Sequence, residues 1–371
     1  MSLNRTRVEE AEINQRDRID SLSRLPKATV IIVNTNELHH LKICLPSVFA
    51  QNYPDFEVLI VDNASSDGSV EYIEAHYPTA RIIRNLENLG YTGANNVGFM
   101  NATGEFIAVL NPDTRVESDW LKELVLALLA DPSAGLATPK ILLMDRPMQI
   151  NTCGNEITFT GLTFCRGLDE PAHNYQDTEI VPAVSGAAFV IRKSVLDRIG
   201  GFDDGLFIYY EDTDLSLRAR LAGFHCLYVP TSVVYHRYRF RFSARKCFYQ
   251  ERNRYISMLK IFRWRTIVLL LPTLFVGEVV AWGYAILMGW EHTLSKLRAD
   301  LWLVANWRQI MESRRCTQRL RQAPDKDILS KFGYRLRFTQ TTSPVLSSLM
   351  GFLFNPGLWL PGCIYKKVII W

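Results

Sequence analysis

Residues 56–69 read FEVLIVDNASSDGS, and this stretch combines the two signals that decide the fold. Its first part is a short, largely apolar run that ends in Asp62, which is typical of a strand covered on both faces of a sheet. Its second part, from Ser66 to Gly68, carries the residue types that favour a helix start. A strand followed directly by a helix is the repeating unit of a parallel α/β sheet.

The same alternation extends outward from this stretch in both directions. Strands and helices are predicted to alternate over residues 28–33, 37–51, 56–62, 66–76, 80–84, 88–104, 106–110, 119–130 and 135–143. Because strands that alternate with helices pair in parallel through right-handed crossovers, the sequence predicts an α/β fold with a mostly parallel sheet and flanking helices.

The pattern becomes mixed after residue 152. We expect a hairpin within residues 155–167, a strand within 184–193, and a helix from about Asp212 to residue 221. Residues 226–236 are expected to form one or two strands, divided by Pro230. A parallel α/β half is therefore followed by a mixed half.

Bulk composition limits the function classes. A formal net charge of +4 over 371 residues is too small to indicate nucleic-acid binding on its own. None of the seven cysteines forms a CxxC pair, so neither a zinc site nor a disulfide framework is indicated, and a reducing compartment fits best. The N-terminal segment is polar and lacks the apolar core of a secretory signal.

The C-terminal third has a different composition. Residues 237–265 carry ten Lys or Arg and one acid, and residues 266–290 are apolar except for Glu278. The apolar segment has the length of a membrane span. Its interruptions at Pro272 and Glu278 also fit a shallow hairpin or an in-plane helix, and a third alternative is a helix pair packed on the α/β domain. The tail, residues 347–371, is apolar and looks interfacial.

These changes divide the chain into three expected parts. Residues 1–26 form a polar N-terminal arm, residues 27–250 form the α/β domain, and residues 251–371 form a basic and apolar helical region that contacts a membrane.

Polar residues at strand ends are the first candidates for a ligand site. Ligands of open α/β sheets bind at the carboxyl ends of the strands, where Asp62 and Asn63 are placed to bond a nucleobase or sugar, although a plain turn and helix cap is the alternative. The glycines at 90, 93 and 98 match neither the GxGxxG nor the P-loop spacing, which counts against a dehydrogenase and a P-loop enzyme. An amide-rich turn before a helix suits a diphosphate.

Three further sites carry acids or histidine. Asp113, in EFIAVLNPDTR (residues 105–115), is either a turn residue or a ligand for a divalent cation that also binds phosphates. Residues 209–223, YYEDTDLSLRARLAG, hold three acids in four positions, and a helix cap requires one, so the remainder suggests a general base. His236 ends a strand, where a histidine is usually simply exposed.

These pieces, in this order, resemble glycosyltransferase family 2, which has the Rossmann-like GT-A fold, and most of all its bacterial rhamnosyltransferase-like members. The resemblance covers about residues 28–245. Its matching stretches are VIIVNTNELHHLKICLPSVFAQ, VDNASSDGSVEYI, NLGYTGANNVGF, VLNPDTRVESDWL, VSGAAFVIRKSVL, GGFDDGLFIYYEDTDLSLRARLAGF and VYH.

The resemblance implies roles for particular residues. Those that would line the pocket of the nucleotide-sugar donor are Val33, Asn34, Asn36, Asp62, Asn63, Gly90, Asn95 and Asn111. Asp113 corresponds to the last acid of the family's metal-binding DxD motif, in which Asn111 replaces the first acid, and His236 matches a histidine that completes the metal site. Asp212 corresponds to the catalytic base, with Glu211 as a neighbour that competes for this role.

The implied activity is that of a metal-dependent, inverting hexosyltransferase with Mg²⁺ or Mn²⁺ as cofactor. It would move a sugar, with rhamnose as one candidate, from a dTDP- or UDP-sugar to a hydroxyl of a glycan or lipid-linked acceptor in cell-surface polysaccharide synthesis. The basic stretch after His236 suits an anionic membrane surface on the cytoplasmic face of the cell membrane. No nucleic-acid partner is expected.

Two alternatives remain open at this point. A sugar-1-phosphate nucleotidyltransferase also places an aspartate after an α/β strand, but it would need a glycine-rich motif and a basic residue after the first strand, and VIIVNTNE has neither. A catalytically degenerate, membrane-bound scaffold is the second alternative, and the presence of Asp113, Asp212 and His236 argues against it.

Overall fold

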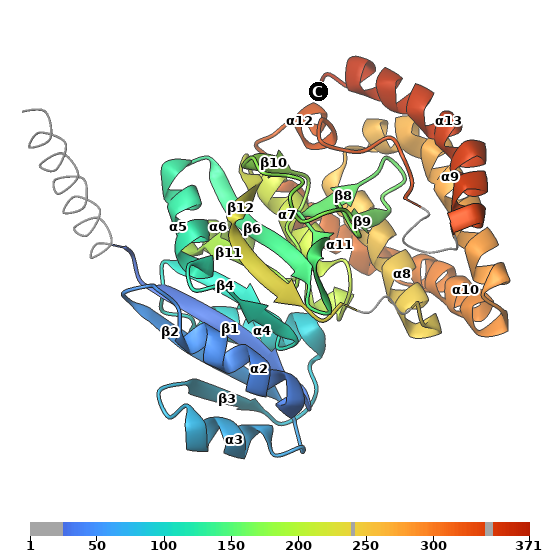
Figure 1. Cartoon of the computed structure of the whole chain (residues 1–371). Helices are drawn as coiled ribbons and strands as arrows, with labels where there is room; N and C mark the ends of the chain where they lie inside the picture. The colour runs from blue at the N-terminus through green and yellow to red at the C-terminus, as the bar shows by residue number, and fades with distance from the viewer. Residues whose placement is uncertain (1–24, 239–241, 338–343) are drawn as a thin grey trace, which may run out of the picture.

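The computed structural model describes residues 25–238, 242–337 and 344–371, so the expected N-terminal arm lies outside the described residues except for its last two positions. One mixed sheet with helices on both faces forms the body of the molecule, and a group of C-terminal helices packs at one side (Figure 1).

Ten strands of the described residues form the main sheet, and its central order is β10-β12-β6-β11-β4-β1-β2-β3. Their bounds are β1 Ala28–Asn34, β2 Phe56–Asn63, β3 Arg81–Asn85, β4 Phe106–Leu110, β5 Thr114–Val116, β6 Ala134–Leu143, β7 Arg146–Thr152, β10 Glu179–Val181, β11 Ala188–Arg192 and β12 His225–His236. β5 pairs with β12 and β7 pairs with β6. A separate hairpin joins β8 Asn155–Ile157 to β9 Thr163–Cys165.

The strand pairing gives a mixed sheet in which β1, β2, β3 and β4 form the predicted parallel part. β1 is buried along its whole length and pairs in parallel with β2 and with β4, as expected for an apolar strand with neighbours on both sides. β11 lies antiparallel between β4 and β6, and β12 runs parallel to β6. The carboxyl ends of β1, β2 and β4 therefore meet at one edge, where Asn34 lies opposite Asp62.

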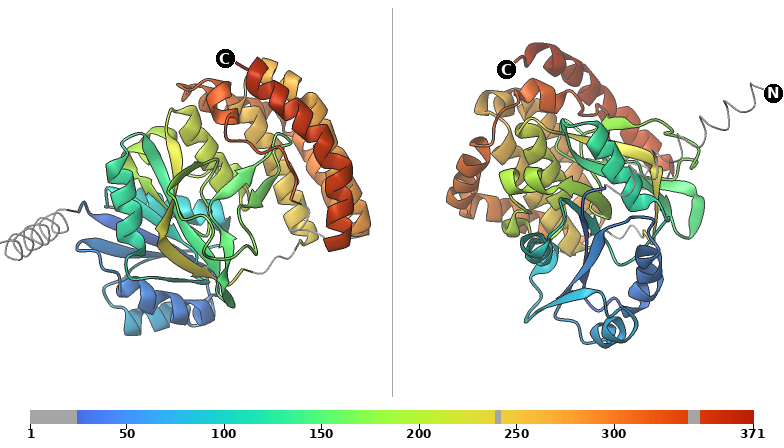
Figure 2. Two further views of the ribbon diagram at one scale, coloured as in Figure 1. Left: turned by 45° about the horizontal axis from the view of Figure 1, so that its top comes forward. Right: turned by 90° about the vertical axis from the view of Figure 1, so that its left-hand side faces the viewer.

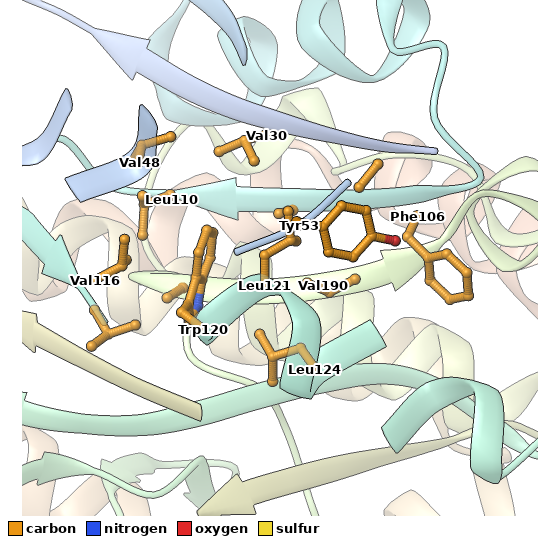
Figure 3. Packing of buried hydrophobic residues seen from close by; sticks show 14 of the residues in the cluster. Val30, Val48, Tyr53, Phe106, Leu110, Val116, Trp120, Leu121, Leu124 and Val190 are labelled. Atoms are coloured by element: carbon orange, nitrogen blue, oxygen red, sulfur yellow. The ribbon is translucent and has the colours of Figure 1, made fainter. Parts of the chain in front are cut away.

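Helices cover both faces of this sheet. One face packs on α2 Leu38–Phe49, α3 Ser69–His76 and α5 Trp120–Ala130, and Figure 3 shows Trp120 of α5 among Leu110, Val116 and Val48. The other face packs on α4 Gly90–Asn101, α6 Lys193–Ile199 and α7 Glu211–Leu221. Each core is built from alternate residues of the same strands, which is what a two-faced buried strand requires.

Several local expectations can now be compared with the structure. The hairpin within residues 155–167 is confirmed. Pro230 does not divide β12, which remains one strand with an irregular register between Val229 and Val233. Three strands were not predicted: β5 and β10 have three residues each, too short for a periodic pattern, and β7 begins with three exposed residues, one of them a proline.

The C-terminal part consists of helices packed against the α/β body. They are α8 Ala244–Ile261, α9 Trp264–Leu287, α10 Trp290–Ala305, α11 Trp307–Gln318, α12 Asp325–Leu329 and α13 Pro344–Val368. α8 runs across the expected limit at residue 250. A third core joins Leu217 and Leu221 of α7 to α8, α9 and α12. In both views of Figure 2 the red α13 lies outermost in this group, and it packs along α9.

α9 is, within the part of the chain that the structure describes, the one helix long and apolar enough to cross a membrane. Core helices of soluble proteins can be equally long and apolar. Glu278 of α9 is paired inside the protein: its carboxylate lies 2.7 Å from Arg254 of α8 and 2.8 Å from Lys296 of α10. One face of α9 is thus held against its neighbours by ion pairs.

Candidate active site

A cavity of about 390 Å³ lies between the sheet edge and the C-terminal helices. Its polar lining includes Tyr91, Asn111, Asn151, Asn155, Gly186, Glu211, Asp212 and His236. Its apolar lining includes Leu162, Phe164, Val280, Ala281, Leu336 and Met350. Of the residues predicted from the sequence, Asn111, Glu211, Asp212 and His236 therefore share one cavity.

The two acids enter the cavity from an unusual stretch of backbone. Phe207, Tyr209 and Tyr210 all have positive φ angles, of 65°, 64° and 74°, directly before Glu211. Such angles are unfavourable for residues with a side chain, and they persist only where the surroundings impose them. This left-handed stretch starts α7 at the point where its first two side chains face the cavity.

Helix α8 supplies the contacts that hold this stretch. The side-chain amide nitrogen of Asn253 lies 3.0, 3.0 and 2.7 Å from the carbonyl oxygens of Leu206, Ile208 and Tyr209. Arg252 donates to the carbonyl oxygen of Gly205 at 2.7 Å. Buried carbonyl groups require such partners, so α8 fixes the approach to the acids. Neither residue carries a signal in the sequence that identifies this role.

Asp212 is held by neutral hydrogen-bond donors. Its Oδ2 accepts from the Gly186 N–H at 2.8 Å and from the Asn155 amide at 3.0 Å, and its Oδ1 accepts from the Thr213 N–H at 2.6 Å. Burial raises the pKa of Asp212, and these hydrogen bonds oppose the rise without cancelling it. The result is a fixed carboxylate with raised proton affinity.

Glu211 differs from its neighbour in having an unsatisfied atom. Its Oε2 is buried without a hydrogen-bond partner among the described residues. Burial and the adjacent Asp212 raise the pKa of Glu211 to about 8. A pKa of about 8 favours the protonated form of Glu211 at neutral pH, whereas the hydrogen-bond donors around Asp212 favour its charged form.

The third acid of this run, Asp214, points away from the cavity. Its carboxylate is fully buried and lies 2.8 Å from Arg218 Nε and 2.9 Å from Lys260 Nζ of α8. Burial alone would raise the pKa of Asp214, but the two cations lower it to about 2. Asp214 is a structural ion-pair residue.

Asp113 and His236 are brought together by strand pairing. β12 runs antiparallel to β5 with His236 opposite Thr114, so the His236 ring reaches the neighbouring Asp113, and Nε2 lies 3.3 Å from Oδ1. The other ring nitrogen, Nδ1, lies 2.8 Å from Oδ1 of Asn151. Burial would raise the pKa of Asp113, but the hydrogen bond and charge of His236 lower it.

This pair offers one oxygen and one nitrogen ligand to a divalent cation. An imidazole whose far nitrogen is held by a side-chain oxygen has the arrangement usual for a metal-binding histidine. No cluster of three or more His, Cys, Asp or Glu side chains suited to a metal ion exists among the described residues. The residues present therefore fit a cation that takes its other ligands from a bound phosphate and water.

Asn111 occupies the boundary between this pair and the acids. Its N–H donates to the carbonyl of Ala187 at 2.9 Å, and its Oδ1 lies 3.2 Å from the Tyr91 hydroxyl. The same hydroxyl lies 2.8 Å from the carbonyl of Gly186. Tyr91, Gly186 and Asn155 are site residues that sequence reasoning missed. Gly186 lay inside a recognised stretch, but only the fold reveals its contact with Asp212.

Asn34, Asn36 and Asp62 lie at the carboxyl ends of β1 and β2 and join the two loops. Asn34 donates to Asp62 Oδ1 at 2.7 Å, and Asn36 Oδ1 accepts from the Ser66 N–H at 2.7 Å. Val33 is 9% exposed and lies beside them on β1. These residues do not line the 390 Å³ cavity, nor does Asp113.

The remaining predicted residues shape the turn before α4. Asn63 accepts from the Leu89 N–H at 3.0 Å and donates to Asn88 at 2.8 Å. Gly90 has φ +75°, and a Cβ there would lie 2.6 Å from the Phe207 ring, so a larger residue is excluded. Asn95 is fully buried on α4, where its Nδ2 donates to the Tyr91 carbonyl.

Comparison with known families and proteins gives consistent matches. Residues 29–200 match the family model described as Glycosyl transferase family 2. The chain is 29% identical to N-acetylglucosaminyl-diphospho-decaprenol L-rhamnosyltransferase of Mycobacterium tuberculosis, over 56% of this chain and 75% of that protein. It is 27% identical to the probable glycosyltransferase YdaM of Bacillus subtilis, over 58% of this chain and 52% of YdaM. It is 28% identical to protein y4gI of Sinorhizobium fredii, over 57% of this chain and 24% of y4gI. The matches thus span less than two thirds of YdaM and y4gI.

Two solved structures are similar in fold. Residues 1–349 of S. aureus TarS give a TM-score of 0.51 at 16% identity and cover 92% of this chain and 91% of that one. GalNAc-T7, crystallised with UDP, GalNAc and Mn²⁺, gives a TM-score of 0.50 at 23% identity and covers 58% of this chain and 44% of that one. These likenesses confirm the GT-A arrangement that the strand order indicates.

Proposed function

Because the α/β part of this chain belongs to glycosyltransferase family 2, we propose that the protein transfers a sugar from a nucleotide-diphosphate sugar to a hydroxyl of a glycan or lipid-linked acceptor, with inversion at the anomeric carbon. The observation that carries this proposal is the Asp212 carboxylate, which is held in the cavity by the Gly186 N–H and the Asn155 amide. A rhamnosyl donor is the first candidate, since one relative is a rhamnosyltransferase.

The proposed reaction is a single displacement. Asp212 takes the proton of the acceptor hydroxyl as its oxygen forms a bond to the anomeric carbon. The bond from that carbon to the diphosphate oxygen breaks, and its electron pair leaves with the nucleoside diphosphate. Attack from the face opposite the leaving group inverts the configuration. Glu211 stays protonated, so it does not compete with Asp212 as base.

Asp113 and His236 are proposed to hold Mg²⁺ or Mn²⁺ against the donor diphosphate. The cation would offset the charge that develops on the departing diphosphate. The Asp113–His236 contact of 3.3 Å and the Asn151 partner of His236 support this assignment. Asn111 is proposed to contact the donor directly, which fits its position in the cavity lining.

The donor nucleotide is proposed to bind along the carboxyl ends of β1 and β2. Val33, Asn34, Asn36 and Asp62 would contact the base and ribose there. The Asn63-supported turn before α4, with Gly90, would face the sugar diphosphate, and the buried Asn95 would support this turn through its hydrogen bond to the Tyr91 carbonyl. Open α/β sheets bind ligands at such an edge, and the adjoining cavity leaves room for an acceptor beside Asp212.

A binding panel tests the donor assignment without knowledge of the acceptor. We expect one of the dTDP-, UDP- or GDP-sugars, with Mn²⁺, to raise the melting temperature of both the wild type and Asp212→Asn, since a ligand at 100 times its Kd stabilises the native state by about 2.7 kcal/mol. EDTA or Asp113→Asn should reduce this shift. Absence of any shift across the panel would contradict the proposal.

We further propose that the protein attaches to the cytoplasmic face of the cell membrane through α9 and α13. The outward side of α9 exposes Val268, Leu271 and Phe275 at helical spacing, with Phe275 68% exposed. Exposed apolar side chains in such a row favour insertion into the interfacial region of a bilayer, while the ion pairs of Glu278 hold the opposite side on the protein.

Vesicle sedimentation tests this attachment. We expect the wild type to pellet with anionic vesicles and Phe275→Asp to remain largely in the supernatant, because a charge opposes insertion of the apolar face. Met100→Asp is the matched control: Met100 is 78% exposed, but on α4. Equal sedimentation of the two variants would reject this surface.

A further inference from the structure

The catalytic cavity has two chemically different halves. One half is polar and contains Asn111, Gly186, Asp212 and His236. The other half is lined mainly by apolar side chains from three separate segments: Leu162 and Phe164 of the β8–β9 hairpin, Val280 and Ala281 of α9, and Met350 of α13. Arg254 of α8 also lines the cavity, and its charge is paired with Glu251 and Glu278. A nucleotide sugar is polar throughout, so the donor gives no reason for the apolar half.

The apolar side chains of this half belong to one packed cluster. Val280, Leu336 and Leu358 form a buried cluster, and Leu162, Phe164 and Met350 pack against it without being fully buried themselves. The cluster joins the hairpin, α9 and α13, which are far apart in the sequence. Apolar walls that remain open to a cavity favour an apolar ligand, because such a ligand removes their surface from water.

The two helices that line the apolar half also carry exposed apolar side chains close in sequence to the cavity residues. Val279 precedes the cavity residue Val280 and is 45% exposed, and Phe352 follows Met350 by two positions and is 79% exposed. An apolar chain lying in the cavity would therefore meet the surface of α9 and α13 that we assign to the bilayer. The polar end of such a molecule would lie beside Asp212.

From this arrangement we propose that the apolar half is a binding site for the hydrocarbon chain of the acceptor. The acceptor is then an amphiphile, with a hydroxyl-bearing polar head at Asp212 and a chain that runs between the β8–β9 hairpin and α9 toward the bilayer. This inference rests on the proposed function and narrows it, because a free water-soluble glycan would leave the apolar half unused.

Photolabelling tests the site without knowledge of the acceptor head. The probe is a diazirine-bearing hexadecanol, added to the full-length protein on phospholipid vesicles, with diazirine-bearing butanol as the short-chain comparison. We expect the long probe, and not the short one, to label peptides containing residues 162–164 and 280–284. Label confined to the outer residues 268–275 would overturn the proposal.

Two substitutions on the same helix sharpen the test. Ala281→Trp fills the apolar half and should lower cavity labelling by about fivefold, whereas Val279→Trp, on the outer side, should change it less than about twofold. Leu162→Trp closes the site from the hairpin and serves where Ala281→Trp fails to fold. Equal labelling of filled and control variants with native melting temperatures rejects the site.

Labelling requires neither donor nor turnover. A failure of the proposed glycosyl transfer would therefore appear as an absence of nucleotide-sugar binding and would leave the labelling unchanged. A failure of the acceptor site would leave nucleotide-sugar binding intact.

Discussion

Asp212 and Asp214 lie two residues apart in the first turn of α7, yet they face two different regions of the molecule. Asp212 faces the cavity, receives hydrogen bonds from neutral donors, and has a raised pKa. Asp214 faces α8, is paired with Arg218 and Lys260, and has a pKa of about 2. Both are buried carboxylates, so burial alone does not separate the proposed base from an ion-paired acid; the charge of the partners does.

The largest effect is expected on turnover, when Asp212, the proposed base, is neutralised. Asp212→Asn should lower turnover by about 10³-fold, within the range for loss of a general base. Because the folded protein disfavours the ionised form of Asp212, the melting temperature should stay the same or rise. Turnover is measured as release of nucleoside diphosphate with the donor found in the binding panel. Near wild-type turnover would show that Asp212 is not the base.

Substitution of Asp214, the ion-paired acid, should lower the stability of the folded protein. Asp214→Asn leaves Arg218 buried without its counter-charge and leaves Asp203 as the remaining ion-pair partner of Lys260, and we expect the free energy of unfolding at pH 7 to fall by about 3–5 kcal/mol. Urea denaturation measures this change. An unchanged midpoint would mean that the ion pairs contribute nothing to stability.

The same residue predicts a pH dependence with a definite sign. The folded pKa of about 2 lies below the ordinary value of 3.8, so the stabilisation is complete above about pH 4 and is lost as the pH falls toward 2. The wild type should therefore lose part of its stability over that window, and Asp214→Asn should lack this part of the loss.

A smaller effect on stability and turnover is expected at Asn253, which connects α8 to the stretch before Asp212. Asn253→Ala removes an amide that contacts the carbonyls of Leu206, Ile208 and Tyr209, and should cost about 1–3 kcal/mol of stability. Since it loosens the stretch before Asp212, kcat should fall while donor affinity remains. Asn253→Asp keeps the shape but loses the donors, so it should resemble the alanine variant. A drop in donor affinity alone would contradict this role.

The smallest effect is expected at Glu211. Its pKa of about 8 keeps it protonated at neutral pH, so Glu211→Gln should retain turnover at pH 7 to within a few-fold. The wild-type pH–rate profile should show an ionisation near pH 8 that this variant lacks. The reverse outcome, in which Glu211→Gln is inactive and Asp212→Asn is active, would exchange the two assignments.

The sequence predicted the parallel strands and the edge at which their polar residues gather, because burial on both faces leaves a continuous apolar run and strand ends leave polar turns. It did not reveal the partners of Asp212. Gly186 reaches Asp212 because β11 inserts antiparallel between β4 and β6, and Asn155 because the β8–β9 hairpin lies over α7. Such long-range pairings leave no periodic trace in the chain.

Glu278 illustrates the same limit in the C-terminal region. In the sequence it interrupts an apolar segment and weakens a membrane span. In the structure it is neutralised by Arg254 and Lys296, which come from the preceding and following helices. A charge in an apolar segment is informative only together with its partners, and those partners lie on other helices.

The contacts from Asn253 and Arg252 have a consequence for how relatives of this protein can exchange parts. The matched family segment ends at residue 200, yet the stretch that presents Asp212 is fixed by α8, which begins at Ala244. A chimaera that joins the α/β part of one enzyme to the C-terminal helices of another keeps these contacts only if α8 comes from the same enzyme as the α/β part. The natural unit of recombination therefore ends after α8, at about residue 261.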